Sequence, residues 1–110
     1  MSSIPKVKRY ETRFEHEGFF ALYFEDQTYL EVPFYEFLSW ACESDESLLK
    51  YLQGLPPYYT VYEEVEDLVE LGYDFQSKFP GYLHHCEQAY PGFMYEFRLP
   101  VEDLPPNYSD

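Results

Sequence analysis

The side chains of this 110-residue chain that could do chemistry are mostly carboxylates. There are 21 Asp and Glu residues against 7 Lys and Arg, with three His and two Cys. Catalytic carboxylates work in clefts that shift their pKa values, but most of these acids fall on faces that we expect to be solvated. The sequence has no nucleophile elbow, phosphate-binding loop, dinucleotide fingerprint or zinc-protease motif. We therefore expect no catalytic residues and no enzyme activity.

One cluster, His84, His85 and Cys86, has the residue types of a metal site. Neighbouring residues on a helix point about 100° apart, so these three side chains do not converge on one ion. His16 and Cys42 could join them only through tertiary contact. We expect Cys86 in the core, solvated histidines, and neither a metal nor a cofactor. With no CxxC pair, both cysteines are expected as free thiols in a reducing cytoplasm.

A stronger signal is a row of carboxylates on a predicted helix at 60–72 (TVYEEVEDLVELG). Its apolar residues recur at i, i+4, i+7 and i+8 from Val61, which is typical of one buried stripe. Thr60 and Glu63 fit a capping box, and Gly72 fits the helix C-terminus. The acids on the other side, called the acidic row below, are Glu63, Glu66, Asp67 and Glu70, with Glu64 beside them. No Lys or Arg lies at i+3 or i+4 to neutralise them.

The acidic row has a spacing that suits imitation of nucleic acid. Carboxylates three or four residues apart on a helix lie about 4.5–6 Å apart along its axis, and successive phosphates of one strand have a comparable spacing. Nearby tyrosines would add contact area, whereas carboxylates alone mainly speed association. The predicted partner-binding residues are Tyr59, Tyr62, Glu63, Glu66, Asp67, Glu70 and Tyr73. The acids that could extend the row are Glu43, Asp45, Glu46, Glu102 and Asp103.

The overall charge agrees with a basic partner. The net charge is −14, and residues 14–110 alone hold 20 acids and 3 bases. Such a body repels nucleic acid and anionic membrane and attracts basic surfaces. No apolar run approaches the ~18 residues of a membrane span, and the N-terminus lacks the apolar region of a signal peptide. We expect a cytoplasmic protein, and the alternative is that its acidity serves solubility alone.

Two PPxY segments, at 56–59 (PPYY) and 105–108 (PPNY), match ligands of WW-type modules. With nine prolines and thirteen tyrosines in the chain, chance matches are expected.

Hydrophobic spacing predicts an α+β fold, in the order βββ-ααα-β, with three to four helices on one face of a four-stranded antiparallel sheet. The predicted strands are 7–15, 19–24, 28–32 and 93–99. The predicted helices are near 34–52, 61–71 and 78–89. The first is either one bent helix or two, with Ser44 or Asp45 capping the second. Ser77 is expected to cap the last helix, and Pro80 is tolerated in its first turn.

Residues 1–100 are expected to form one compact acidic domain, followed by a proline-rich acidic tail at 101–110. The predicted core residues are Phe14, Phe20, Leu22, Leu30, Phe37, Leu38, Leu52, Val65, Leu68, Leu83 and Phe97.

Together these observations predict a small acidic inhibitor that binds a basic nucleic-acid-handling protein, such as a nuclease, by imitating phosphates. Anti-CRISPR, anti-restriction and nuclease immunity proteins form this physical class. The alternative is a non-inhibitory interaction or assembly module, and an enzyme comes third.

We predict that the purified protein does not bind nucleic acid, because its acidic body repels phosphates. The basic segment with Lys6, Lys8, Arg9 and Arg13 is the one place that could reverse this, and we interpret it as a solvated or edge strand guarded against aggregation. A gel shift with duplex DNA at low and high salt checks the prediction. Salt-sensitive retention of the DNA would contradict it.

Overall fold

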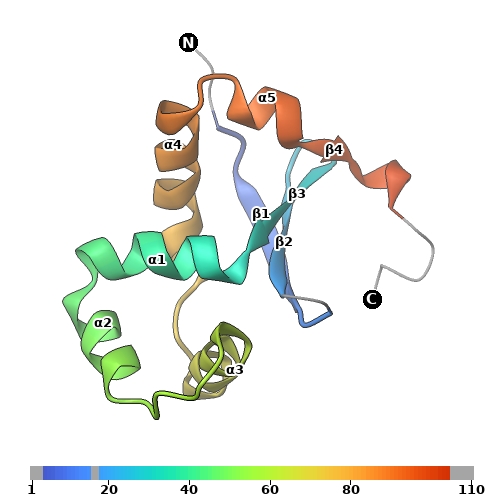
Figure 1. The fold of residues 1–110 in the computed structure, drawn as a ribbon. Helices are drawn as coiled ribbons and strands as arrows, with labels where there is room; N and C mark the ends of the chain where they lie inside the picture. The colour runs from blue at the N-terminus through green and yellow to red at the C-terminus, as the bar shows by residue number, and fades with distance from the viewer. Residues whose placement is uncertain (1–3, 16–17, 105–110) are drawn as a thin grey trace.

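The computed structural model describes residues 4–15 and 18–104, which form a sheet with helices packed on one face (Figure 1). The strands are β1 (Val7–Arg13), β2 (Phe19–Phe24), β3 (Thr28–Pro33) and β4 (Leu99–Pro100). The helices are α1 (Phe34–Ser44), α2 (Glu46–Gln53), α3 (Val61–Leu71), α4 (Phe79–Ala89) and α5 (Phe93–Phe97), with short 3-10 turns η1 (Gln76–Lys78) and η2 (Val101–Asp103). The predicted α+β class and four-stranded antiparallel sheet are confirmed.

The sheet has the order β1-β2-β3-β4, with every neighbouring pair antiparallel. The central strand β2 is apolar on both faces, and Leu22 pairs with Tyr10 on one side and Leu30 on the other. β1 lies at an edge, where Arg9 and Arg13 both form ion pairs with Glu11. This agrees with the interpretation of the basic segment as an edge strand.

The last predicted strand, 93–99, is wrong over most of its length, because Phe93–Phe97 is the helix α5. The spacing of Phe93 and Phe97 fits a helix as well as a strand. The deciding group is the carboxylate of Glu87, which accepts hydrogen bonds from the backbone N–H of Gly92 (2.8 Å) and Met94 (3.0 Å). These are N–H groups that a helix start leaves without partners. Only β4 remains to pair with β3.

Asp45 separates α1 from α2, so the interpretation as two helices is correct. The residue is extended, with φ of −117°, and its side chain accepts a hydrogen bond from the N–H of Leu48 at 3.1 Å. The predicted cap at Ser77 is wrong. Its N–H instead donates to Asp74, and η1 precedes α4. Pro80 does lie in the first turn of α4.

Most of the predicted core is confirmed. The buried members are Phe20, Leu22, Leu30, Phe37, Leu38, Val65, Leu68 and Leu83. Phe14 and Leu52 are half-buried against that core. The prediction that Phe97 is a core residue is wrong, because its side chain is 45% exposed. It belongs to the helix α5 and not to the strand from which the prediction was made.

The centre of the core is a cluster of phenylalanine rings around Phe20 of β2. Its ring centroid lies 4.8 Å from Phe34, 5.2 Å from Phe37, 5.0 Å from Phe75 and 5.4 Å from Phe79. All five side chains are 0% exposed. Aromatic pairs contribute about 0.5–1.5 kcal/mol beyond their buried area. This cluster therefore fixes α1, α4 and the segment before η1 on the sheet.

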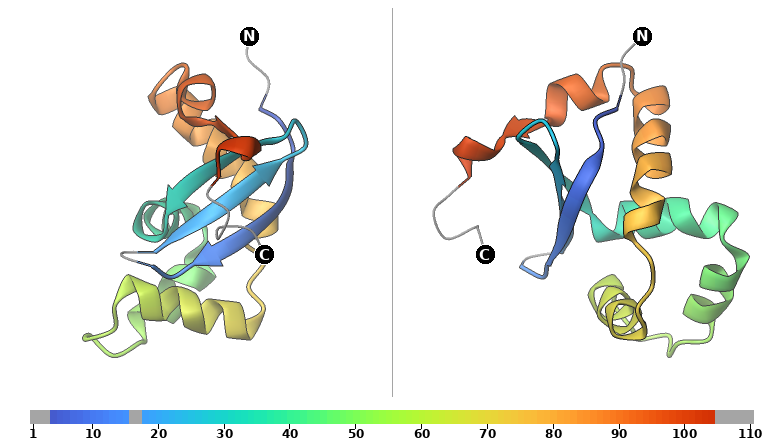
Figure 2. Two further views of the ribbon diagram at one scale, coloured as in Figure 1. Left: turned by 90° about the vertical axis from the view of Figure 1, so that its right-hand side faces the viewer. Right: turned by 180° about the vertical axis from the view of Figure 1, so that it is seen from behind.

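The opposite face of the sheet is covered by η2. Figures 1 and 2 show α1, α3 and α4 on one side of the strands and η2 on the other. Ala21, Tyr23 and Tyr29 are buried there, with Val101 and Leu104 packed against them. The first residues after β4 therefore contribute a second, smaller apolar cluster.

Three features named in the sequence analysis lie outside the described residues. These are the second PPxY segment at 105–108, the end of the tail and His16. The first PPxY segment is a turn between α2 and α3, in which the N–H of Tyr59 donates to the carbonyl of Pro56 at 3.0 Å.

We predict that Gly18→Ala destabilises the fold more than Gly72→Ala. Both glycines have positive φ, 88° and 79°, so each substitution costs about 1–2 kcal/mol in backbone strain. A Cβ at position 18 would also lie 2.5 Å from two ring carbons of buried Phe34, whereas one at position 72 meets nothing within 4 Å. Overpacking adds about 1–3 kcal/mol. Urea denaturation of both variants measures the difference, and equal losses would contradict the proposed clash.

Candidate functional site

Helix α3 carries the acidic row, and its local sequence forms the predicted caps. The N–H of Glu63 donates to the Thr60 hydroxyl at 3.2 Å, while the Glu63 carboxylate accepts from the Thr60 N–H at 2.9 Å. Gly72 ends the helix in the left-handed conformation. Val65 and Leu68 are buried. The helix therefore presents one side to the core and the acids to the other.

The four acids of the row have different local roles. Glu66 and Glu70 are exposed, four residues apart, and make no ion pair or hydrogen bond to another described residue. Glu63 is committed to the capping box. Asp67 lies near the hydroxyl of Tyr59, and this carboxylate raises the pKa of that tyrosine. Glu66 and Glu70 are thus the acids with charge available to a partner.

Glu64 does not belong to this outer face. It is half-buried, and burial raises the pKa of its carboxyl. Burial also raises the pKa of the Cys42 thiol on α1, and the charge of Glu64 raises it further. Glu64 therefore faces α1.

Of the three predicted tyrosines, only Tyr59 stays beside the acidic row. Tyr62 packs its ring 4.8 Å from Phe14. The hydroxyl of Tyr73 donates to Asp45 at 2.9 Å and its ring lies 5.0 Å from buried Phe75. Burial raises the pKa of Tyr73. The structure thus gives both residues packing roles.

Three apolar or aromatic side chains are exposed around α3. Val69 is 43% exposed, Leu71 66% and Tyr58 78%. Val69 was expected in the buried stripe, but only Val65 and Leu68 of this helix are buried, with Val61 half-buried against the core. The periodicity alone does not show how wide a stripe the rest of the molecule covers.

The five further acids do not extend the row as one surface. Asp45 is held by Leu48, Tyr73 and Lys78, whose Nζ lies 3.4 Å from its carboxylate. Glu102 and Asp103 belong to η2, on the opposite side of the sheet (Figure 2). Glu46 is in the first turn of α2, and Glu43 borders a different surface.

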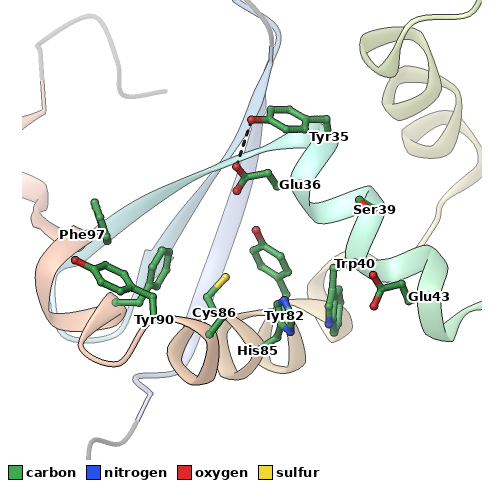
Figure 3. A pocket seen from close by; sticks show the side chains of 12 residues that line it. Tyr35, Glu36, Ser39, Trp40, Glu43, Tyr82, His85, Cys86, Tyr90 and Phe97 are labelled. Carbon is green, nitrogen blue, oxygen red and sulfur yellow. Dashed lines mark hydrogen bonds between the residues drawn. The ribbon is translucent and has the colours of Figure 1, made fainter.

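That surface is a groove of about 540 Å³ between α1, α4 and α5, called the aromatic groove below (Figure 3). Its aromatic lining residues are Tyr35, Trp40, Tyr82, Tyr90, Phe93 and Phe97. Glu36, Glu43, Ser39, His85 and Cys86 supply its polar atoms. Sequence reasoning missed this site, because α1 is far in the chain from α4 and α5, which form the rest of it. A local signal for it is Trp40, which lies at the margin of the helical spacing formed by Phe34, Phe37, Leu38 and Ala41.

The described histidines and cysteines are His84, His85, Cys42 and Cys86. His84 and His85 are exposed, as expected, and Cys86 is half-buried against the core. Burial raises the pKa of the Cys86 thiol. Within the described residues, no three His, Cys, Asp or Glu side chains come together as ligands.

Within the same described ranges, none of the helices has both the length and the apolar character needed to cross a membrane. Comparisons with protein-family models, curated proteins and solved structures find no match to this chain. The functional argument therefore depends on the geometry of the two surfaces.

We predict that Asp45→Ala destabilises the protein by about 1–2 kcal/mol, because it removes a helix cap and the partner of Tyr73. Glu46→Ala, at the exposed neighbouring position, is the control and should change stability by less than about 0.5 kcal/mol. Urea denaturation at pH 7 compares the two variants.

The same pair of variants tests the electrostatic origin of the effect. The hydrogen bond from the Leu48 N–H, followed by that from Tyr73, lowers the pKa of Asp45 below its ordinary 3.8. A lowered folded-state pKa stabilises the fold above the unfolded value, and this contribution disappears as the pH falls through the folded value. The stability difference between wild type and Asp45→Ala should therefore shrink when the pH is lowered below 3.8. A pH-independent difference would contradict this assignment.

Proposed function

We propose that the protein is a small acidic inhibitor that binds a basic, nucleic-acid-handling protein through the outer face of α3. The observation that carries the proposal is the pair Glu66 and Glu70, exposed and unpaired within the described chain, next to exposed Val69 and Leu71. Charges attract and orient a basic partner, and the apolar side chains supply the area that strengthens the complex.

The geometry of this face supports imitation of a phosphate row. Residues four apart on a helix are separated by about 6 Å along its axis. The capping box and the C-terminal Gly72 hold α3 at both ends, so the two carboxylates are presented by a rigid element. A preordered binding element loses less conformational entropy in a complex.

The state of the two cysteines supports a cytoplasmic location for the proposed inhibitor. Both cysteines are free thiols within the described structure, as in a reducing cytoplasm. The proposed partner normally holds nucleic acid in a Lys/Arg channel. This protein and the nucleic acid would therefore compete for the same channel. Inhibition would therefore be competitive with nucleic acid.

The test is a pair of charge reversals on two different faces. Glu66→Lys/Glu70→Lys alters α3, and Glu102→Lys/Asp103→Lys alters η2. Each variant raises the net charge by four, from −14 to −10, so the effect of overall charge is matched. All four positions are exposed, and we expect both variants to keep the wild-type melting temperature.

Affinity is measured against the partner purified after capture from the native host. The α3 variant should bind at least about thirtyfold more weakly, since losing a desolvated charge pair costs about 2–5 kcal/mol. The η2 variant should stay within about threefold of wild type. Duplex DNA or RNA should displace the wild-type protein from its partner. Equal losses for both variants, or no displacement by nucleic acid, would refute the proposal.

A further inference from the structure

We propose that the aromatic groove binds a segment of a partner protein that carries an Arg or Lys side chain, with the cationic group beside Glu36. This surface lies on α1, α4 and α5, and the inference is independent of the function proposed for α3. Its occupant is inferred from the groove's shape, its aromatic walls and its charge.

One end of the aromatic wall packs against the core, and the other end is formed by exposed rings that pack on each other. Tyr82 of α4 is only 4% exposed, and its ring lies 5.5 Å from Phe37 and 5.4 Å from Trp40. At the other end, Phe97 lies 5.8 Å from Tyr90 and 5.1 Å from Phe93. Ring faces and edges arranged in this way are suited to hold apolar side chains and cations.

The groove is negatively charged at its rim. Figure 3 shows Glu36 and Glu43 projecting from α1, with Glu36 above Tyr82 and Glu43 beside Trp40. They are seven residues apart, about 10.5 Å along the helix. The hydroxyl of Tyr35 donates a hydrogen bond to Glu36 at 3.3 Å, and the hydroxyl of Tyr82 points toward the same carboxylate. The phenol of Tyr35 orients the carboxylate, and because a phenol carries no positive charge it leaves the negative charge of the carboxylate in place.

The protein supplies no strong base to this site. All the lining residues are in the described part of the chain, and none is Lys or Arg. Lys78 pairs with Asp45, and Arg98 pairs with Asp26. An anionic ligand would be repelled here, and a purely apolar one would cover Glu36 without a charge partner, which is costly. A cationic group is the complementary occupant.

The extent of the surface favours a chain segment over a small cation. A second hollow of about 230 Å³ continues along β3 and shares Glu36, Tyr82, Phe93 and Phe97 with the groove. Around both hollows, large apolar side chains are exposed, including Tyr35 at 51% and Leu99 at 46%. Exposed apolar surface rimmed by charge is typical of protein interaction sites.

The first experiment uses Trp40, the only tryptophan in the chain, as a fluorescence reporter inside the groove. The probe is the blocked peptide acetyl-GLRALRG-amide, titrated with excitation at wavelengths where tyrosine does not absorb. We expect a saturable change in Trp40 emission. A peptide with both arginines replaced by citrulline, a neutral isostere, should bind at least about fivefold more weakly. Equal binding of both peptides, or no saturable change, would overturn the proposal.

The second experiment compares matched variants of the protein. Glu36→Gln should weaken binding of the arginine peptide about fivefold, as expected for losing one solvent-accessible charge pair, whereas Glu66→Gln on α3 should not. Tyr90→Ala removes one wall of the groove and should weaken binding. Tyr95→Ala, on the neighbouring helix α5, is its control and should not weaken binding. Tyr95 lies outside both hollows and is 84% exposed. Circular dichroism confirms that each variant is folded.

Two results of this comparison would refute the assignment. If Glu66→Gln or Tyr95→Ala weakens binding as much as its groove counterpart, the peptide binds elsewhere. If N-acetyl-argininamide binds as tightly as the peptide, the groove is a site for a small cation and not for a protein segment.

Discussion

The structure depends on the packing of one phenylalanine, Phe20, among four other rings. Because Phe34 and Phe37 come from α1, Phe75 from the segment before η1, and Phe79 from α4, this contact joins three separate parts of the chain to β2. Buried rings packed this closely, edge to face or tilted, have few alternative arrangements. The angle between α1 and α4 is thereby fixed, and the aromatic groove is the space that this angle leaves open on the outside.

The distribution of acids follows from this packing. A chain with a net charge of −14 must place its carboxylates where the core does not reach. Several of them stabilise the fold locally, as Asp45 does for α2, Glu63 for α3 and Glu87 for α5. Such residues accept hydrogen bonds from backbone N–H groups at helix starts. Carboxylates without such a role, including Glu66 and Glu70, are the ones from which function can be argued.

The two proposed surfaces combine charge and apolar area in different ways. On α3 the charges dominate, which favours rapid association with a basic surface and sensitivity to salt. In the aromatic groove, rigid rings surround Glu36, which favours a single anchoring side chain. In these proposals, α3 attracts a basic partner surface, and the aromatic groove selects one cationic side chain of a partner.

Local chemistry determined much of this fold. The capping box at Thr60, the left-handed Gly72 and the alternating strands could be recognised from neighbouring residues, because these features depend on contacts within a few positions. The helix at Phe93–Phe97 could not, since its start is stabilised by Glu87 on the preceding helix. Whether Tyr62 and Tyr73 face a partner or the core was likewise decided by rings and a carboxylate distant in the chain. The sequence determined which side chains are available, and tertiary packing decided which remain exposed, because burial depends on what the rest of the molecule covers.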